Sequence, residues 1–223
     1  MFEFLDQEVF AIITRTLFMT FTSTAISATL GIPLGLWLAQ ANFTGKKLVV
    51  TVNRTLLAAP PVVVGLVVFL LFRRFGPFGA LGWLFTMQAM IIAQVIIITP
   101  IICSIVYTAA SRNGDRIRSF ALTMGADKVQ TRILLIKELS NEMFFSVVTG
   151  FGRAMSEVGA IMIVGGNIRH HTRTMTTSIS RLGNQGEIDQ AIFLGAVLMI
   201  IAFVVQMIGN TFMKKEQRTD ENF

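Results

Sequence analysis

Apolar stretches of membrane-spanning length are the feature that most constrains the fold of this chain. Four stretches contain no charged residue, and they cover residues 16–41, 55–72, 83–110 and 190–213. A helix rises about 1.5 Å per residue, so about 20 apolar residues cross the hydrocarbon core of a bilayer. A fifth stretch, residues 139–167, is apolar apart from Glu142, Arg153 and Glu157. Five such stretches predict a bundle of membrane-spanning helices.

The composition agrees with that prediction. Charged residues make up 14% of the 223 residues and hydrophobic residues 53%, whereas a typical soluble domain is roughly 25% charged. We therefore expect an all-α polytopic membrane protein that forms a single domain over residues 1–223. The expected spans are 14–41, 55–72, 83–110, 139–166 and 190–213, with a cytoplasmic loop at 112–137.

Lysine and arginine residues predict the orientation, because they gather in the cytoplasmic loops of membrane proteins. Most of them follow the first and third expected spans or lie in the C-terminal tail: Lys46, Lys47, Arg54, Arg112, Arg116, Arg118, Lys128, Arg132, Lys137, Lys214, Lys215 and Arg218. With five spans these segments share one side, so we expect the C-terminus in the cytoplasm and the N-terminus outside. Segments 73–74 and 169–181 then carry cations outside, and positive charge in segment 169–181 would suit the mouth of an anion pathway.

Proline positions predict where the spans bend. Pro33 and Pro100 lie inside the first and third spans, and Pro60 and Pro61 stand near the start of the second. Proline lacks a backbone N–H and disturbs the preceding helical turn, so each position predicts a kink or a helix start. Cys103 is the only cysteine in the sequence, which excludes a disulfide within the chain.

A basic segment between the third and fourth spans predicts contact with a cytosolic partner. Its apolar residues recur in a helical pattern between residues 117 and 139, and Gly125 interrupts that pattern. Glycine costs about 1 kcal/mol relative to alanine inside a helix. We therefore expect two short helices, one along the membrane face and one leading into the fourth span. An ordinary cytoplasmic loop is the alternative.

Two parts of the chain resemble a known family. SFALTMGADKVQTRILLIKEL, residues 119–139, is similar to the coupling loop of ABC-importer permeases, with Ala121 and Gly125 at matching positions and departures elsewhere. GFGRAMSEVGAIMIVGGNIRHHTRTMTTSI, residues 150–179, and APPVVVGLVVFLL, residues 59–71, resemble the molybdate/tungstate branch of those permeases more closely. Within that branch the chain looks most like the tungstate-type permease subunit.

The resemblance implies a multi-pass permease of the inner, or cytoplasmic, membrane that works as a homodimer by alternating access. Its implied partners are two cytosolic ABC ATPase subunits and an extracytoplasmic oxyanion-binding protein. The implied cargo is tungstate, with molybdate or another tetrahedral oxyanion as the alternative. The residues expected to couple to the ATPase are Ala121, Leu122, Gly125, Ala126 and Asp127.

Two charged residues at membrane depth are candidates for the transport pathway. Arg153 and Glu157 are four residues apart, so they are expected to share a helix face, and each is costly in a bilayer. They either form an intrahelical or interhelical ion pair that orients the dimer or line the pathway, with Arg153 as a transient partner for a dianion. We assign the pathway and gate to these two residues together with four small or polar ones: Ser156, Gly165, Gly166 and Asn167.

Catalytic and cofactor motifs are missing from the sequence. There is no glycine-rich phosphate loop followed by Lys-Ser/Thr, so ATP and Mg²⁺ are expected on the partner ATPase and no enzyme activity on this chain. The adjacent His170 and His171 make a poor metal site, and a role as titratable gate groups is the alternative. The Thr- and Ser-rich segment 172–180 offers hydroxyl donors to an oxyanion or to a lobe of the receptor, or it forms a solvated loop. A non-transporting membrane anchor and a secondary transporter are the alternatives from other functional classes.

Overall fold

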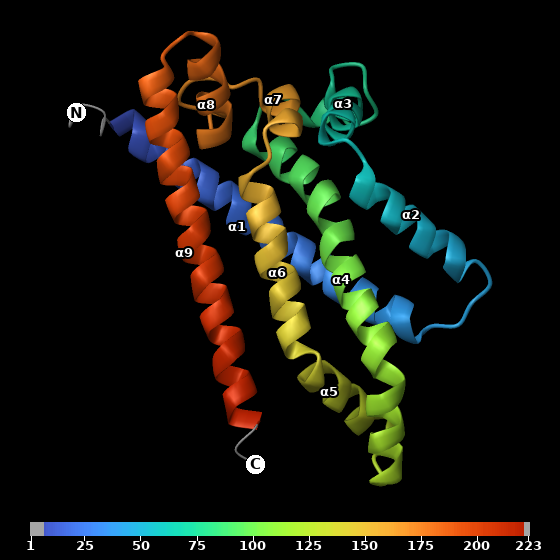
Figure 1. Ribbon diagram of the computed structural model, residues 1–223. Helices are drawn as coiled ribbons and strands as arrows, with labels where there is room; N and C mark the ends of the chain where they lie inside the picture. Colours follow the sequence, from blue (N-terminus) through green and yellow to red (C-terminus); the bar gives the residue numbers. More distant parts are fainter. Residues whose placement is uncertain (1–6, 221–223) are drawn as a thin grey trace.

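The computed structural model describes residues 7–220, and this part of the chain is entirely helical outside its loops (Figure 1). The side chains of Lys214, Lys215 and Arg218, used above for the orientation, lie outside the described part. The elements in order are α1 (Gln7–Gln40), α2 (Lys46–Ala58), α3 (Pro61–Phe72), the 3-10 helix η1 (Gly79–Leu81), α4 (Met87–Thr123), α5 (Lys128–Glu138), α6 (Ser140–Met155), α7 (Gly159–Gly165), α8 (Met175–Asn184) and α9 (Ile188–Asp220).

Three helices are long and apolar enough to cross a membrane, namely α1, α4 and α9. Two bent pairs are long and apolar enough only when their helices are taken together: α2 meets α3 at 103°, and α6 meets α7 at 60°. With 12 residues, α3 reaches only about 18 Å of the roughly 30 Å hydrocarbon core. The described chain therefore has three spans, or five when each bent pair counts as one.

The bend between α2 and α3 follows from the consecutive prolines. Pro60 has an extended backbone, and Pro61 is the first residue of α3, where a missing N–H costs nothing. The connection between the first two expected spans is mostly helical, because α2 begins at Lys46 and forms an amphipathic helix with no buried residue. The Asn53 side-chain amide donates to Pro100 O at 3.3 Å and attaches α2 to α4.

The expected cytoplasmic loop at 112–137 is likewise more helical than predicted. Residues 112–123 continue α4 instead of forming a separate short helix. Ile117 packs against the buried Ala110, Leu135 and Leu139, so one face of this extension has apolar support. The expected second helix is present as α5, and it leads into α6 after a single residue.

The core is built around α4, which packs against α1, α6 and α7 (Figure 1). Its buried apolar cluster includes Met19, Val68, Met90 and Ile161, which come from α1, α3, α4 and α7. In Figure 1 the start of α1 lies at one end of the molecule with α3, α7 and α8. The end of α4, α5 and the end of α9 lie at the other. The cationic segments 112–137 and 169–181 therefore lie at opposite ends.

Candidate functional site

The break between α6 and α7 holds three of the predicted pathway residues. Helix α6 ends at Met155 and α7 begins at Gly159, so Ser156 and Glu157 lie between the two helices. Arg153 stands in the last turn of α6, and its carbonyl accepts a hydrogen bond from the Ser156 hydroxyl at 3.0 Å. Residues from one short stretch thus surround a 60° change of helix direction.

The Glu157 carboxylate connects the two helices across this break. Its Oε2 accepts from Arg153 Nη1 at 2.7 Å, and its Oε1 accepts from the Ala160 backbone N–H at 3.1 Å. The Glu157 side chain is 4% exposed and that of Arg153 34% exposed. An acidic side chain at a helix N-terminus satisfies backbone donors there. One carboxylate therefore holds the end of α6 and the start of α7 together.

Arg153 and Glu157 form an ion pair within one chain, but the expected geometry of that pair is wrong. The two residues do not share a helix face, since α6 ends before Glu157. No proline marks this break. Close packing supports it instead: a Cβ on Gly159 would lie 2.7 Å from Val62 Cγ2, and a Cβ on Gly65 would lie 2.7 Å from Ala160 Cα. Helix α7 is thus pressed against α3.

Helix α8 attaches to the same break and to α1. The Thr176 hydroxyl donates to Glu157 O at 3.0 Å, and the Met175 backbone N–H donates to the Thr16 hydroxyl at 2.9 Å. Thr174 and Thr177 form a reciprocal capping box at the start of α8. The interpretation of segment 172–180 as a solvated loop is wrong, because Thr174, Thr176 and Thr177 are all buried.

The predicted gate residues Gly165, Gly166 and Asn167 lie at the far end of α7. Gly166 closes the helix in the left-handed region at φ +68°, and Asn167 follows at φ +50°. The Thr172 hydroxyl donates to Gly165 O and accepts from the Ile168 N–H at 2.9 Å, which fixes the turn. The Asn167 Oδ1 is buried without a hydrogen-bond partner. This group lies at the opposite end of α7 from Arg153 and Glu157.

Gln94 is a site residue that the sequence analysis missed. It is fully buried in α4, accepts from the Ser23 hydroxyl at 2.7 Å and donates to Ala154 O at 3.0 Å. The Ala154 carbonyl belongs to the last turn of α6, where backbone acceptors lose their helical partners. Gln94 thereby connects α1 and α4 to the helix end beside the break. An amide inside a charge-free apolar stretch was the available signal.

The predicted coupling residues gather where α4 turns into α5. Gly125 has φ +77°, and a Cβ at this position would have no atom within 4 Å. Asp127 caps α5 by accepting from the backbone N–H groups of Val129 and Gln130. Ala121 is buried, while large apolar side chains around the turn are exposed: Phe120, Leu122, Met124, Val129, Ile133 and Ile136. An exposed apolar patch of this kind marks a protein or membrane contact.

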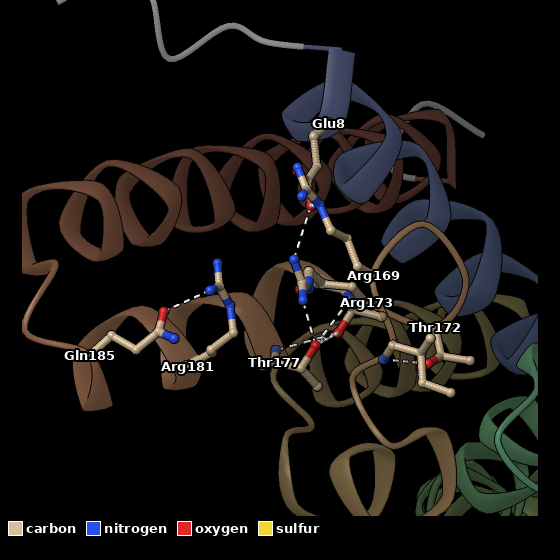
Figure 2. A network of polar contacts seen from close by, with 9 residues as sticks. Glu8, Arg169, Thr172, Arg173, Thr177, Arg181 and Gln185 are labelled. Atoms are coloured by element: carbon tan, nitrogen blue, oxygen red, sulfur yellow. Dashed lines mark hydrogen bonds and ion pairs between the residues drawn. The ribbon is translucent and has the colours of Figure 1, made fainter.

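A cluster of arginines lies near the start of α1 and α8 (Figure 2). Glu8 Oε1 accepts from Arg173 Nη1 at 2.9 Å, and Glu8 Oε2 accepts from Arg169 Nη2 at 2.5 Å. These ion pairs join α1 to the loop before α8. Burial lowers the pKa of Arg173 below its ordinary value, and repulsion from Arg181 adds to that effect.

Metal ligands do not gather in the described residues, since no group of three or more His, Cys, Asp or Glu side chains there could hold an ion. His170 and His171 are both exposed, and His170 has φ +60°. The arrangement offers ion pairs, helix breaks and hydroxyl donors.

A family model described as the binding-protein-dependent transport system inner membrane component matches residues 31–214. The chain belongs to this family. A tungstate uptake system permease protein, TupB, of Peptoclostridium acidaminophilum is 44% identical over 91% of the chain and 89% of its own length. A probable anion ABC transporter permease protein of Haloferax volcanii is 36% identical over 88% of the chain and 87% of its own length.

The fold of this permease has a counterpart among solved structures. It matches an inward-facing structure of the MetNI methionine ABC transporter with a TM-score of 0.76 and 20% sequence identity. The match covers 96% of this chain and 97% of that one, and it supports the fold alone. Family membership identifies the chain as a multi-span inner-membrane component that works with a binding protein and an ABC ATPase and is not itself the ATPase.

Proposed function

We propose that this permease imports tungstate as two copies of the chain assembled with two ATPase subunits and an external oxyanion-binding protein. The observation that carries the cargo assignment is the 44% identity to a tungstate uptake permease over 91% of the chain. The permease of an anion transporter at 36% identity supports an anionic cargo as well.

The coupling surface is assigned to the turn between α4 and α5. Its exposed apolar residues, Leu122 and Val129 among them, would fit a cleft on an ATPase. Ala121, Gly125, Ala126 and Asp127 shape this turn: Gly125 has φ +77°, the Ala126 N–H donates to Ala121 O at 3.0 Å, and Asp127 caps α5. In the proposed function, the ATPase binds the turn between α4 and α5 and displaces it when the ATPase changes conformation.

The path of that motion runs from α5 into α6. Leu139 alone separates the two helices, and it is 1% exposed, packed with Ala110 and Leu135. A displacement of α5 therefore moves α6 without a flexible linker between them. The end of α6 is tied to α7 by Glu157, so the motion reaches the break and the gate residues Gly165, Gly166 and Asn167. Nucleotide shifts this equilibrium only if the ATPase contacts the two arrangements differently.

The exposed apolar face of α3 supports the proposal that two copies of the chain assemble. Val62, Val63, Leu66, Val67 and Leu70 are all more than 40% exposed and lie on one face by their spacing of three and four residues. Val62 also touches the break at Gly159. A twofold axis beside this face would build a central pathway from two copies, through an isologous contact.

The test of this function is uptake by the reconstituted complex. Permease, ATPase and binding protein are assembled in vesicles with ATP inside, and internal tungsten or molybdenum is measured by mass spectrometry. Tungstate uptake that exceeds molybdate uptake is the expected result. If the complex prefers molybdate, molybdate and not tungstate is the cargo. If the assembled complex hydrolyses ATP but takes up no oxyanion, the chain is better explained as a membrane anchor.

A further inference from the structure

The arginine cluster of Figure 2 holds Arg173 close enough to Arg181 for their like charges to repel. Arg169 and Arg173 share Glu8, while Arg181 Nη1 donates to Gln185 Oε1 at 2.6 Å. Among the described residues, Arg181 therefore pairs with an amide and not with a carboxylate. Figure 2 shows the guanidinium groups of Arg173 and Arg181 on the side of α8 that faces Glu8. Like charges held together in this way favour an anion between them.

Hydrogen-bond donors in this cluster remain unused. Arg173 Nε and Arg181 Nε are buried and have no hydrogen-bond partner, and the same holds for Ser178 Oγ. Ser178 is 1% exposed and stands one helical turn before Arg181 on α8. Buried polar groups are nearly always paired, and an unpaired one costs free energy, so three unpaired groups in one region call for a ligand.

The chemistry of these groups defines the ligand. Guanidinium N–H donors bind oxyanions in a planar, charge-assisted geometry, and a hydroxyl adds a further donor. Repulsion between Arg173 and Arg181, together with the burial of Arg173, disfavours the charged empty cluster. A tetrahedral oxyanion carries the opposite charge and offers acceptors in several directions.

We propose that Arg173, Arg181 and Ser178 form a binding site for a tetrahedral oxyanion on the permease itself, between the binding protein and the pathway. This proposal rests on the proposed function, because the position of the site on the route from the binding protein to the pathway assumes that the permease imports the anion. The site adjoins the break between α6 and α7, because Thr176 on the same helix donates to Glu157 O. An anion bound at this site would therefore lie on the helix that is hydrogen-bonded to the break between α6 and α7, the segment to which we propose ATPase motion is transmitted.

Binding to the purified permease, without ATPase or binding protein, tests the site. Tungstate is the probe, and equilibrium dialysis at constant ionic strength with chloride measures its affinity. Arg181→Gln and Ser178→Ala are the chosen variants, because neither residue takes part in the ion pairs to Glu8. Loss of one charge-assisted hydrogen bond is expected to weaken binding about tenfold in Arg181→Gln, and Ser178→Ala is expected to weaken it less.

Arg73→Gln is the matched control, since Arg73 is an exposed cation directly after α3, and α3 lies at the same end of the molecule as α8. It is expected to bind tungstate like the wild type. Equal affinity in wild type, Arg181→Gln and Ser178→Ala, or no binding by the folded wild type, would overturn the site. Thermal unfolding of each variant separates a lost site from a lost fold, and Arg181→Lys, which keeps the charge but lacks the planar donor pair, is expected to restore binding only in part.

Uptake by the assembled complex separates this site from the proposed function. If the wild-type complex imports tungstate and Arg181→Gln imports it at the same rate, the site is wrong and the function stands. If the wild-type permease binds tungstate through Arg181 but the complex imports none, the function is wrong and the site stands.

Discussion

Arg153 Nη1 lies 2.7 Å from Glu157 Oε2, with Arg153 in the last turn of α6 and Glu157 in the break between α6 and α7. The second oxygen of Glu157 accepts from the Ala160 N–H, the second backbone donor of α7. This single carboxylate therefore sets the geometry of a helix break in the apolar part of the molecule. It is the place where displacement of α6 would change the direction of α7.

Glu157→Gln tests this connection. The amide keeps an acceptor for Ala160 but leaves Arg153 without its counter-charge, so stability is expected to fall by about 1–3 kcal/mol. The measurement is chemical unfolding of the purified permease in detergent. Glu142→Gln is the control, because Glu142 lies in the first turn of α6, the helix that carries Arg153, and forms no ion pair among the described residues. Its cost is expected to stay below about 1 kcal/mol. Equal losses in the two variants would contradict the role of the pair.

Gly125→Asp tests the coupling turn. A side chain at φ +77° costs about 1–2 kcal/mol, and a charge there alters the apolar surface offered to the ATPase. The expected result is weaker ATPase assembly, or less tungstate imported per ATP hydrolysed, in a chain that still folds. Gly114→Ala is the control, since Gly114 is helical and a Cβ would meet only Leu135 Cδ1 at 3.9 Å. Full coupling in Gly125→Asp would refute the assignment.

Gly65→Val tests the contact between α3 and α7. A Cβ at this position would lie 2.7 Å from Ala160 Cα, and a backbone atom cannot turn away as a side chain can. Overpacking is expected to cost about 1–3 kcal/mol and to reduce uptake. Gly195→Val in α9, where a Cβ meets nothing within 4 Å, is the matched control. Thermal unfolding and vesicle uptake are measured for both, and a result in which Gly65→Val behaves like Gly195→Val would count against tight packing.

Gln94→Leu tests the buried amide. The substitution removes the hydrogen bonds to Ser23 and to Ala154 O, with an expected loss of about 1–3 kcal/mol in the free energy of unfolding. Gln88→Leu makes the same chemical change at an exposed position one and a half turns earlier in α4. That control is expected to unfold like the wild type. A stable Gln94→Leu protein would mean that the amide does not hold the end of α6.

The sequence was sufficient for the helical spans and for one of the two bends. Bilayer-length apolar runs predict α1, α4 and α9, and the prolines at 60 and 61 predict the bend before α3. The break at Glu157 has no such local signal, since it depends on Gly159 packing against Val62 in a helix far away in the sequence. The spacing of apolar residues along one segment does not reveal its contacts with distant segments. For that reason the prediction that Arg153 and Glu157 share a helix face was wrong.

Polar segments were harder to predict than apolar ones. Segment 172–180 has the composition of a solvated loop, yet four of its threonine hydroxyl groups form hydrogen bonds: Thr172 to Gly165 O, Thr176 to Glu157 O, and Thr174 and Thr177 to one another in a capping box. The extension of α4 to Thr123 was missed for a related reason. Its charged residues face outward while Ile117 and Ala121 pack inward, and this pattern belongs to a helix as well as to a basic loop.

The central claim is that this permease moves an oxyanion only when a partner ATPase drives it. Tungstate uptake into vesicles holding the permease and ATPase, with the binding protein outside, tests it most directly when internal ATP is exchanged for a non-hydrolysable analogue. Uptake is predicted with ATP and none with the analogue, whatever ion gradient is imposed. Uptake by the permease alone in response to an ion gradient would contradict the account and identify a secondary transporter.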